Sequence, residues 1–258
     1  MMNTPTQEIP SRFTSSHLLS SMSPRVRRSI SATIAAVMLA ATASSAQTIS
    51  LSGNDAPTAP FGKSFTATYG QTFTAPIGFN FLQNFSFWLT NDASLGISNP
   101  SSLRFRAYVM GWDVINGRAL GPVLYTSTMQ SGPTALSQRY DFAATNTALS
   151  GSSQYVAFLS ASGLFGTIGV AEATAGVEAS LLGTYTGGQF VFTDNGDSFG
   201  KLTTDAWDFA SGLPEYQAHF AASFSRTAIT AVPEPSSLVL LVAGLSATFF
   251  AGVRRKRA

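Results

Sequence analysis

Apolar and polar residues alternate with a period of two over several short stretches between residues 47 and 231. The clearest stretch covers residues 103–109, where Leu103, Phe105, Ala107 and Val109 alternate with polar or mixed neighbours. This alternation predicts half-buried β-strands, because successive side chains of a strand point to opposite faces. The same pattern recurs at residues 65–75, 85–90 and 216–225. Two further runs, 123–125 and 155–159, are apolar on both faces and predict central strands.

Glycine and asparagine turn signals separate these runs, among them Asn116-Gly117, Gly187-Gly188 and Asn195-Gly196. No segment of residues 47–231 keeps a 3.6-residue period over a dozen positions, and the nearest approach, residues 168–182, is interrupted by Gly176. The sequence therefore predicts an all-β domain over residues 47–231, a β-sandwich or jelly roll, with a closed barrel as the alternative.

Composition narrows the chemistry of this domain. Hydrophobic residues make up 45% of the 258, enough for a core, whereas charged residues make up only 11% against about 25% in ordinary soluble domains. The absence of cysteine excludes disulfides, thiolate metal sites and cysteine nucleophiles. Residues 47–232 hold seven Lys or Arg against eleven Asp or Glu, a formal charge of −4. This balance argues against nucleic-acid binding, which needs a basic surface on the folded part.

The N-terminal region, residues 1–46, has the features of a secretion signal. Arg25, Arg27 and Arg28 precede an apolar run over residues 30–43, and small residues follow up to Ala46. We expect signal peptidase to cleave after Ala46. A signal that starts at Met22 has 25 residues, within the usual range, whereas one that starts at Met1 is too long, so Met22 is the expected start.

The C-terminal region contains a predicted membrane span. Residues 236–253 carry no charge over 18 positions, which is long enough for a transmembrane helix. A basic cluster follows directly and is expected to stay on the cytoplasmic side; it consists of Arg254, Arg255, Lys256 and Arg257. With a signal peptide in front, this orientation puts residues 47–231 outside the cytoplasmic membrane. A buried core helix, the alternative, leaves four cations at its end.

A short proline motif stands directly before this span, consisting of Val232, Pro233, Glu234 and Pro235. The two prolines remove backbone donors and favour an extended, solvated segment that a processing enzyme can reach. The order of motif, apolar helix and basic end over residues 232–258 resembles the PEP-CTERM sorting signal of secreted proteins in Gram-negative bacteria that make exopolysaccharide. The resemblance implies that exosortase, a membrane transpeptidase-like protease, recognises and removes the tail. The motif is then a substrate site, not a catalytic one.

Residues 71–159 also resemble a recurrent β-rich module of PEP-CTERM and other exported bacterial proteins. The resemblance lies in residues 71–76, 103–109, 112–113, 121–125 and 155–159. Such modules look like carbohydrate-binding jelly rolls, and no activity is generally assigned to them. Sorting signal and module together imply an exported protein that is transiently anchored in the inner membrane and then resides in the cell envelope or outside the cell.

Catalytic signals are sparse in residues 47–231. His219 is the only histidine there, and its place on the polar face of the last strand predicts an exposed side chain, not a triad base. A glycosidase needs two converging carboxylates, and the sequence offers a small set of candidates: Glu172, Glu178, Asp205, Asp208 and Glu215. We therefore expect a non-enzymatic protein that binds exopolysaccharide. A secreted polysaccharide hydrolase and a purely structural matrix or adhesive protein are the alternatives.

Three aromatic residues are candidates for carbohydrate contacts, since aromatic faces pack against the apolar faces of sugar rings: Trp88, Trp112 and Tyr108. Arg104 and Arg106 share the predicted face of Tyr108 and suit an anionic sugar or a solvated sheet face. Asp194 and Asp197 are candidate calcium ligands, but Asn195-Gly196 between them more simply predicts a tight hairpin. No other cofactor is expected.

Overall fold

The computed structural model describes residues 46–53, 57–62, 65–165, 173–180, 184–209 and 216–228. The predicted signal region up to residue 45, the expected start Met22 and the whole predicted sorting signal, residues 232–258, lie outside the described residues. No helix in the described ranges is long and apolar enough to cross a membrane. The predicted span 236–253 is not part of these ranges.

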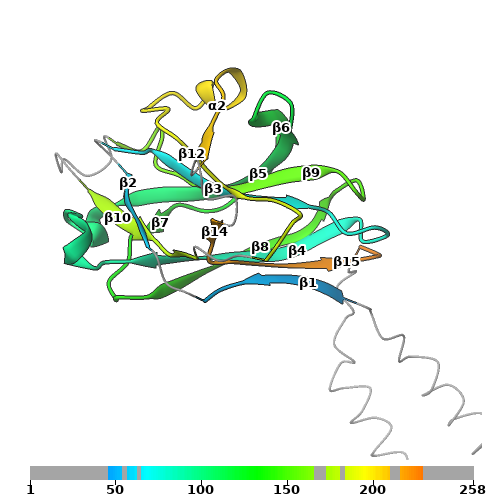
Figure 1. Ribbon diagram of the computed structural model, residues 1–258, viewed down its shortest axis with the longest axis horizontal. Helices are drawn as coiled ribbons and strands as arrows, with labels where there is room; N and C mark the ends of the chain where they lie inside the picture. Colours follow the sequence, from blue (N-terminus) through cyan, green and yellow to red (C-terminus); the bar gives the residue numbers. More distant parts are fainter. Residues whose placement is uncertain are drawn as a thin grey trace, which may run out of the picture. The chain divides into compact units, whose positions relative to one another are not determined.

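The first sheet is built around one long central strand (Figure 1). Strand β4 (Phe81–Thr90) pairs along one edge with β8 (Gln138–Ala148). Along its other edge it pairs first with β15 (Phe220–Ser225) and then with β10 (Thr174–Val177). The strands β1 (Ala46–Leu51) and β2 (Thr58–Gly62) pair with β15 and β10. A separate short pair joins β11 (Ala179–Ser180) to β14 (Gln217–Ala218). In the sequence, β11 follows β10 and β14 precedes β15.

The second sheet has the order β13-β12-β3-β9-β5-β6, and β7 also pairs with β5. Its strands are β3 (Thr68–Thr74), β5 (Arg104–Asp113), β6 (Arg118–Thr126), β7 (Gln130–Ser131), β9 (Gln154–Ser160), β12 (Phe190–Thr193) and β13 (Asp208–Phe209). In the described residues, helical turns are limited to η1 (Ala93–Leu95), η2 (Pro100–Ser102) and α2 (Lys201–Thr204). The predicted all-β class is confirmed, and the named strands pair antiparallel throughout the described residues.

A phenylalanine-rich core lies between the two sheets. Phe73 of β3 contacts Phe220 and Phe224 of β15, with ring centroids 5.9 and 5.8 Å apart. On the first sheet, Phe85 packs on Phe142 at 5.1 Å. Phe73, Phe85, Phe220 and Phe224 occupy the apolar positions of the predicted alternating strands, so the period of two was a correct guide to the inner face there. Phe142 belongs to β8, which was not predicted.

Two buried glutamines connect β3 to β14 within this core. The side-chain nitrogen of Gln71 donates to the side-chain oxygen of Gln217 at 2.5 Å, and the side-chain oxygen of Gln71 accepts from the backbone of Ala218 at 2.9 Å. Gln217 in turn donates to the carbonyl of Gly188 at 3.1 Å. Because each amide finds partners, burial of these polar groups does not leave their hydrogen bonds unmade.

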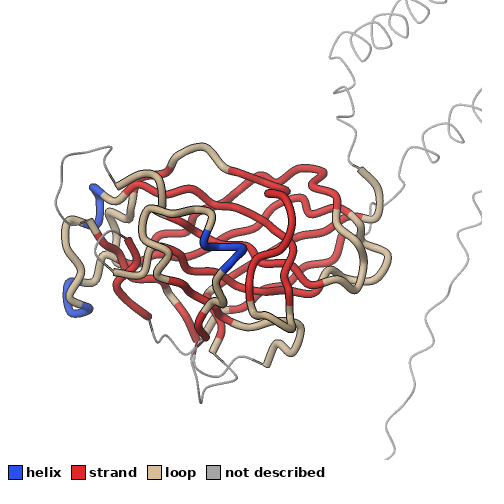
Figure 2. Tube along the Cα trace, turned by 90° about the horizontal axis from the view of Figure 1, so that it is seen from above, coloured by secondary structure: helices blue, strands red, loops and turns tan. Residues whose placement is uncertain are grey.

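A second apolar layer covers the outer face of the second sheet. Tyr108 and Trp112 of β5 lie in a cluster with Leu202 of α2 and Trp207, and Trp207 donates its indole N–H to the carbonyl of Leu202 at 2.9 Å. Figure 2 looks down on this face and shows α2 lying across the strands. The half-buried strand predicted over residues 103–109 is therefore wrong at Tyr108, which is buried because the segment 199–207 shields it from solvent.

The two predicted central strands have different outcomes. Residues 155–159 form β9, which lies between β3 and β5 and is buried on both faces, as predicted. Residues 123–125 belong to β6, which ends the second sheet. Val123 and Leu124 are 38% and 37% exposed, so that prediction is wrong. Gly121 and Pro122 explain the edge position, since proline lacks the donor that a second neighbouring strand requires.

Two predictions about single residues are also wrong. His219 is buried, not exposed, because β14 and β15 break at this position and its ring contacts Glu178, with Nδ1 3.2 Å from Oε2. Asn195-Gly196 does not close a tight hairpin, since β13, the next strand in the sequence and one that pairs with β12, begins only at Asp208. The Asn195 side chain is instead buried and accepts from Thr68 at 2.8 Å.

Because several tyrosines are buried, we expect the free energy of unfolding to fall at alkaline pH. Desolvation by burial raises the pKa of Tyr140 from its usual 10.0 to about 12, and the hydroxyl donates to the carbonyl of Ser131 at 2.9 Å. As pH rises from 10 towards 12, the unfolded chain loses this proton while the folded chain keeps it, so the free energy of unfolding falls. Burial likewise raises the pKa of Tyr69, Tyr108, Tyr125, Tyr185 and Tyr216.

We expect the urea midpoint of unfolding to fall between pH 9 and pH 11, and to fall less in Tyr140→Phe. An equal fall in the variant and the wild type contradicts the role of this phenol.

Candidate functional site

A groove of about 690 Å³ lies on the outer face of the second sheet, and we call it the outer groove. Its floor comes from four adjacent strands, β12, β3, β9 and β5, through Val191, Thr72, Gln154 and Trp112. The hairpin between β5 and β6 and the segment 206–209 line it, as does the loop 184–189. The site thus gathers parts of the chain that are far apart in sequence.

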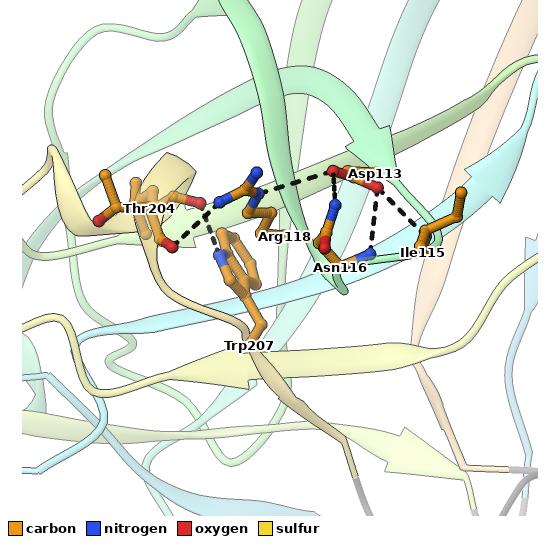
Figure 3. A network of polar contacts seen from close by, with 7 residues as sticks. Asp113, Ile115, Asn116, Arg118, Thr204 and Trp207 are labelled. Atoms are coloured by element: carbon orange, nitrogen blue, oxygen red, sulfur yellow. Dashed lines mark hydrogen bonds and ion pairs between the residues drawn. The ribbon is translucent and has the colours of Figure 1, made fainter.

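The hairpin wall is held by one carboxylate (Figure 3). Asp113 accepts from the backbone N–H groups of Ile115 and Asn116 at 3.1 Å and from the Asn116 side chain at 2.6 Å. These bonds, the one from the Asn116 side chain foremost, lower the pKa of Asp113 below its usual value. Arg118 lies 3.6 Å from the same carboxylate and donates to the carbonyl of Thr204. The Asp113 carboxylate therefore stabilises the hairpin through hydrogen bonds within it.

A backbone contact ties this hairpin to the covering segment. The N–H of Trp207 donates to the carbonyl of Gly117 at 2.7 Å, and the Trp207 ring meets Trp112 edge to face at 5.6 Å. Because both rings are also buried, the hairpin, the covering segment and the floor pack against one another as one unit.

The loop 184–189 is fastened to β3 as the second wall. The N–H of Thr72 donates to the carbonyl of Gln189 at 2.9 Å, and the N–H of Gln189 donates to the hydroxyl of Thr72 at 2.8 Å. Thr74 donates its backbone N–H to the Tyr185 hydroxyl and its own hydroxyl to the carbonyl of Gly187. Both walls of the groove are consequently fixed before any ligand arrives.

The lining of the outer groove combines exposed apolar side chains with amides and hydroxyls. Ile115, Val114 and Phe209 are 94%, 64% and 57% exposed. The polar side chains are uncharged: Thr72, Asn116, Gln154, Thr184, Tyr185, Thr186 and Gln189. No Asp, Glu, Lys, Arg or His is among the described residues that line it. The groove can therefore make apolar contacts and neutral hydrogen bonds.

The structure separates the three predicted carbohydrate-binding residues. Trp112 lines the outer groove. Tyr108 lies on the same sheet face but is covered by Phe199, at 5.0 Å between ring centroids. Trp88 alternates with the core residues of β4 and so lies on the outer face of the other sheet. The Arg139 guanidinium lies over its ring at 5.0 Å, so this arginine, not solvent, occupies one ring face.

The predicted calcium ligands lie in the loop after β12. Asp197 accepts from the backbone N–H of Gly163 at 2.5 Å, and Asp194 is exposed. Asn195 between them donates to Ser162 at 2.6 Å and to the carbonyl of Ser198 at 3.0 Å. Within the described ranges no group of three or more His, Cys, Asp or Glu residues is placed to hold a metal ion.

Of the candidate catalytic carboxylates, the three that the structure describes do not line the outer groove. Glu178 contacts His219, Asp205 accepts from the Thr204 hydroxyl at 2.8 Å, and Asp208 is exposed on β13. Glu172 and Glu215 lie outside the described residues.

Most residues of the outer groove were not predicted from the sequence. Ile115, Phe209, Gln154 and Gln189 were not among the predicted binding residues. One signal was available: Val114 and Ile115 are two large apolar residues directly before the Asn116-Gly117 turn, where a polar tip is usual.

Comparison with known proteins concerns the C-terminal region. A family model described as the PEP-CTERM protein-sorting motif matches residues 231–256. The match includes the predicted motif Val232-Pro233-Glu234-Pro235 and the basic residues Arg254, Arg255 and Lys256; Arg257 follows it directly. All of them lie outside the described residues. No curated protein and no solved structure matches the chain.

Proposed function

We propose that this chain, whose residues 231–256 match the PEP-CTERM protein-sorting motif, is exported to the cell envelope and processed by exosortase. The processed protein is then a non-enzymatic protein that resides in the envelope or the extracellular matrix by binding exopolysaccharide. The sorting motif is the observation that supports export and exosortase processing. The fold alone does not support a particular function, because one sandwich architecture serves many functions.

The proposed route has three steps. Signal peptidase removes residues 1–46 during export. The apolar stretch 236–253 then anchors the chain in the inner membrane, with Arg254, Arg255, Lys256 and Arg257 on the cytoplasmic side. Exosortase finally recognises Val232-Pro233-Glu234-Pro235 and releases the folded domain from its anchor.

The position of the last strand suits such processing. Strand β15 ends at Ser225 and the motif begins at Val232. Seven residues of extended chain reach at most about 25 Å. A segment of this length would let exosortase reach the motif while the domain stays folded.

The outer groove supports binding over hydrolysis. A glycosidase places two carboxyl groups about 5–10 Å apart across the scissile bond, whereas no carboxylate is among the described residues of this groove. A secreted polysaccharide hydrolase and a purely structural matrix protein remain the competing functions. Release of sugar by the protein would favour the hydrolase. Lack of any polysaccharide binding would favour the structural matrix protein.

Replacing Glu234 by Ala tests the sorting step. The change removes the charge between the two prolines but leaves the apolar span and the basic end intact. We expect full-length protein to accumulate in the membrane fraction, while the wild type appears as a shorter, released form on a blot of cell fractions. Ser236→Ala, just outside the motif, is the matched control and is expected to be processed normally. Normal processing and release of Glu234→Ala contradict the proposal.

A further inference from the structure

We infer that the outer groove binds an uncharged polysaccharide chain. This inference rests on the proposed function and names the class of polymer and the surface that holds it. The groove has about 690 Å³, within the range of about 300–1,000 Å³ typical of small-molecule sites. Its exposed lining residues make it accessible from solvent, so a polymer can enter without unfolding either wall.

Exposed apolar side chains give the outer groove a surface that can pack against a sugar ring. Ile115, Val114 and Phe209 are exposed hydrophobic residues of the groove, at 94%, 64% and 57%. Sugar rings present apolar C–H faces that pack against such side chains. Asp113 and the Trp207 backbone hold the hairpin that carries Ile115. Because the walls are already ordered, binding loses little conformational entropy there.

The outer groove also has amide side chains that are not hydrogen-bonded to other described residues. The side chains of Gln154 and Gln189 are only partly buried and make no hydrogen bond with another residue in the part of the chain that the structure describes. Each amide offers a carbonyl acceptor and two N–H donors. Sugar hydroxyls are both donors and acceptors, so they match this set. The exposed hydroxyls of Thr184 and Thr186 extend it along one wall.

Charge decides between neutral and acidic polymers. The described lining contains no cation to pair with a uronate or sulfate group. Residues 47–232 carry a formal charge of −4, which repels polyanions. The arginines that suggested an anionic sugar site lie at the other end of β5 from Trp112, and Arg104 donates to the carbonyls of Ser101 and Leu103 at 3.0 Å. An uncharged chain is therefore the better match.

The test uses the processed protein as it is recovered after export, run in native gels that contain dextran or hydroxyethyl cellulose as neutral probes, alginate as the acidic probe, or the host's own exopolysaccharide. We expect at least one neutral polymer to retard the protein and alginate to leave it unretarded. Phe209→Ala and Gln154→Ala should each weaken the retardation about 3- to 10-fold, the range of one lost ring or hydrogen-bond contact. Phe65→Ala is the matched control, since Phe65 is 47% exposed and does not line the groove.

The contrary outcomes separate the two proposals. Retardation by alginate and not by neutral polymers overturns the class of ligand but leaves the proposed function intact. Neutral binding that Phe209→Ala and Gln154→Ala do not weaken moves the site away from the outer groove. No retardation by any polymer, the host's included, overturns both proposals. In that last case, light scattering that shows a dimer lost in Phe209→Ala would identify the groove as a contact between two copies.

Discussion

We expect Phe220→Ala to lower the free energy of unfolding by about 3–5 kcal/mol, the usual cost of removing a buried phenylalanine ring. Phe220 is fully buried on β15. Its ring lies 5.2 Å from that of Phe87 on the neighbouring strand and 5.9 Å from that of Phe73 on the opposite sheet. Truncation leaves a cavity where the two sheets meet, and the surrounding rings can close it only in part.

Chemical denaturation at neutral pH measures this effect, and Phe209→Ala is its matched control. Phe209 is the same residue type in the same domain but is 57% exposed, so its truncation is expected to change stability by no more than about 0.5 kcal/mol. The pair also separates stability from binding, since only Phe209 lines the outer groove. Similar losses of stability in the two variants would contradict the assignment of Phe220 to the shared core.

The inner core was predictable because it depends on local alternation. Residues 85–90 and 216–225 were expected to be strands with their phenylalanines inward, and Phe85, Phe220 and Phe224 are fully buried. The failed prediction for residues 123–125 has a local cause: an apolar run alone does not distinguish a central strand from an edge strand. Pro122 was the available signal for an edge.

The outer layer was not predictable in the same way. Tyr108 and Trp112 share a face of β5 with Arg104 and Arg106, so the pattern reads as a solvated face. Their cover, the segment 199–207 with Leu202 and Trp207, lies about ninety residues later in the chain. Only the pairing of β12 with β3 brings that segment over β5 and β9, and strand order is a long-range property that periodicity does not encode.

The residues of the outer groove likewise differ in how far they could be predicted from the sequence. Trp112 was a candidate from its residue type alone and does line the outer groove. Gln154 and Gln189 are ordinary polar residues in sequence, and they become a pair of free amides only because β9 and the loop before β12 flank β3. Aromatic candidates can be found from a sequence, whereas the polar partners that give a site its selectivity require the sheet order.

Gly188→Ala is expected to disturb both the fold and the outer groove. A Cβ at this position would overlap the carbonyl group of Thr72 on β3, so the loop 184–189 must move off the strand. That movement strains the hydrogen bonds between Gln189 and Thr72 and the one that the Gly188 carbonyl accepts from buried Gln217. Overpacking of this kind usually costs about 1–3 kcal/mol, and the displaced wall should also weaken retardation by neutral polysaccharides.

Gly200→Ala is the control for this change, since a Cβ there meets no atom within 4 Å and the backbone has an ordinary φ of −60°. We expect it to leave stability unchanged or to raise it by up to about 1 kcal/mol through the lower entropy of the unfolded chain. Denaturation midpoints and native-gel retardation of both variants provide the measurement. If Gly188→Ala matches Gly200→Ala in both, the loop does not depend on its close approach to β3, and the rigid second wall of the groove has to be abandoned.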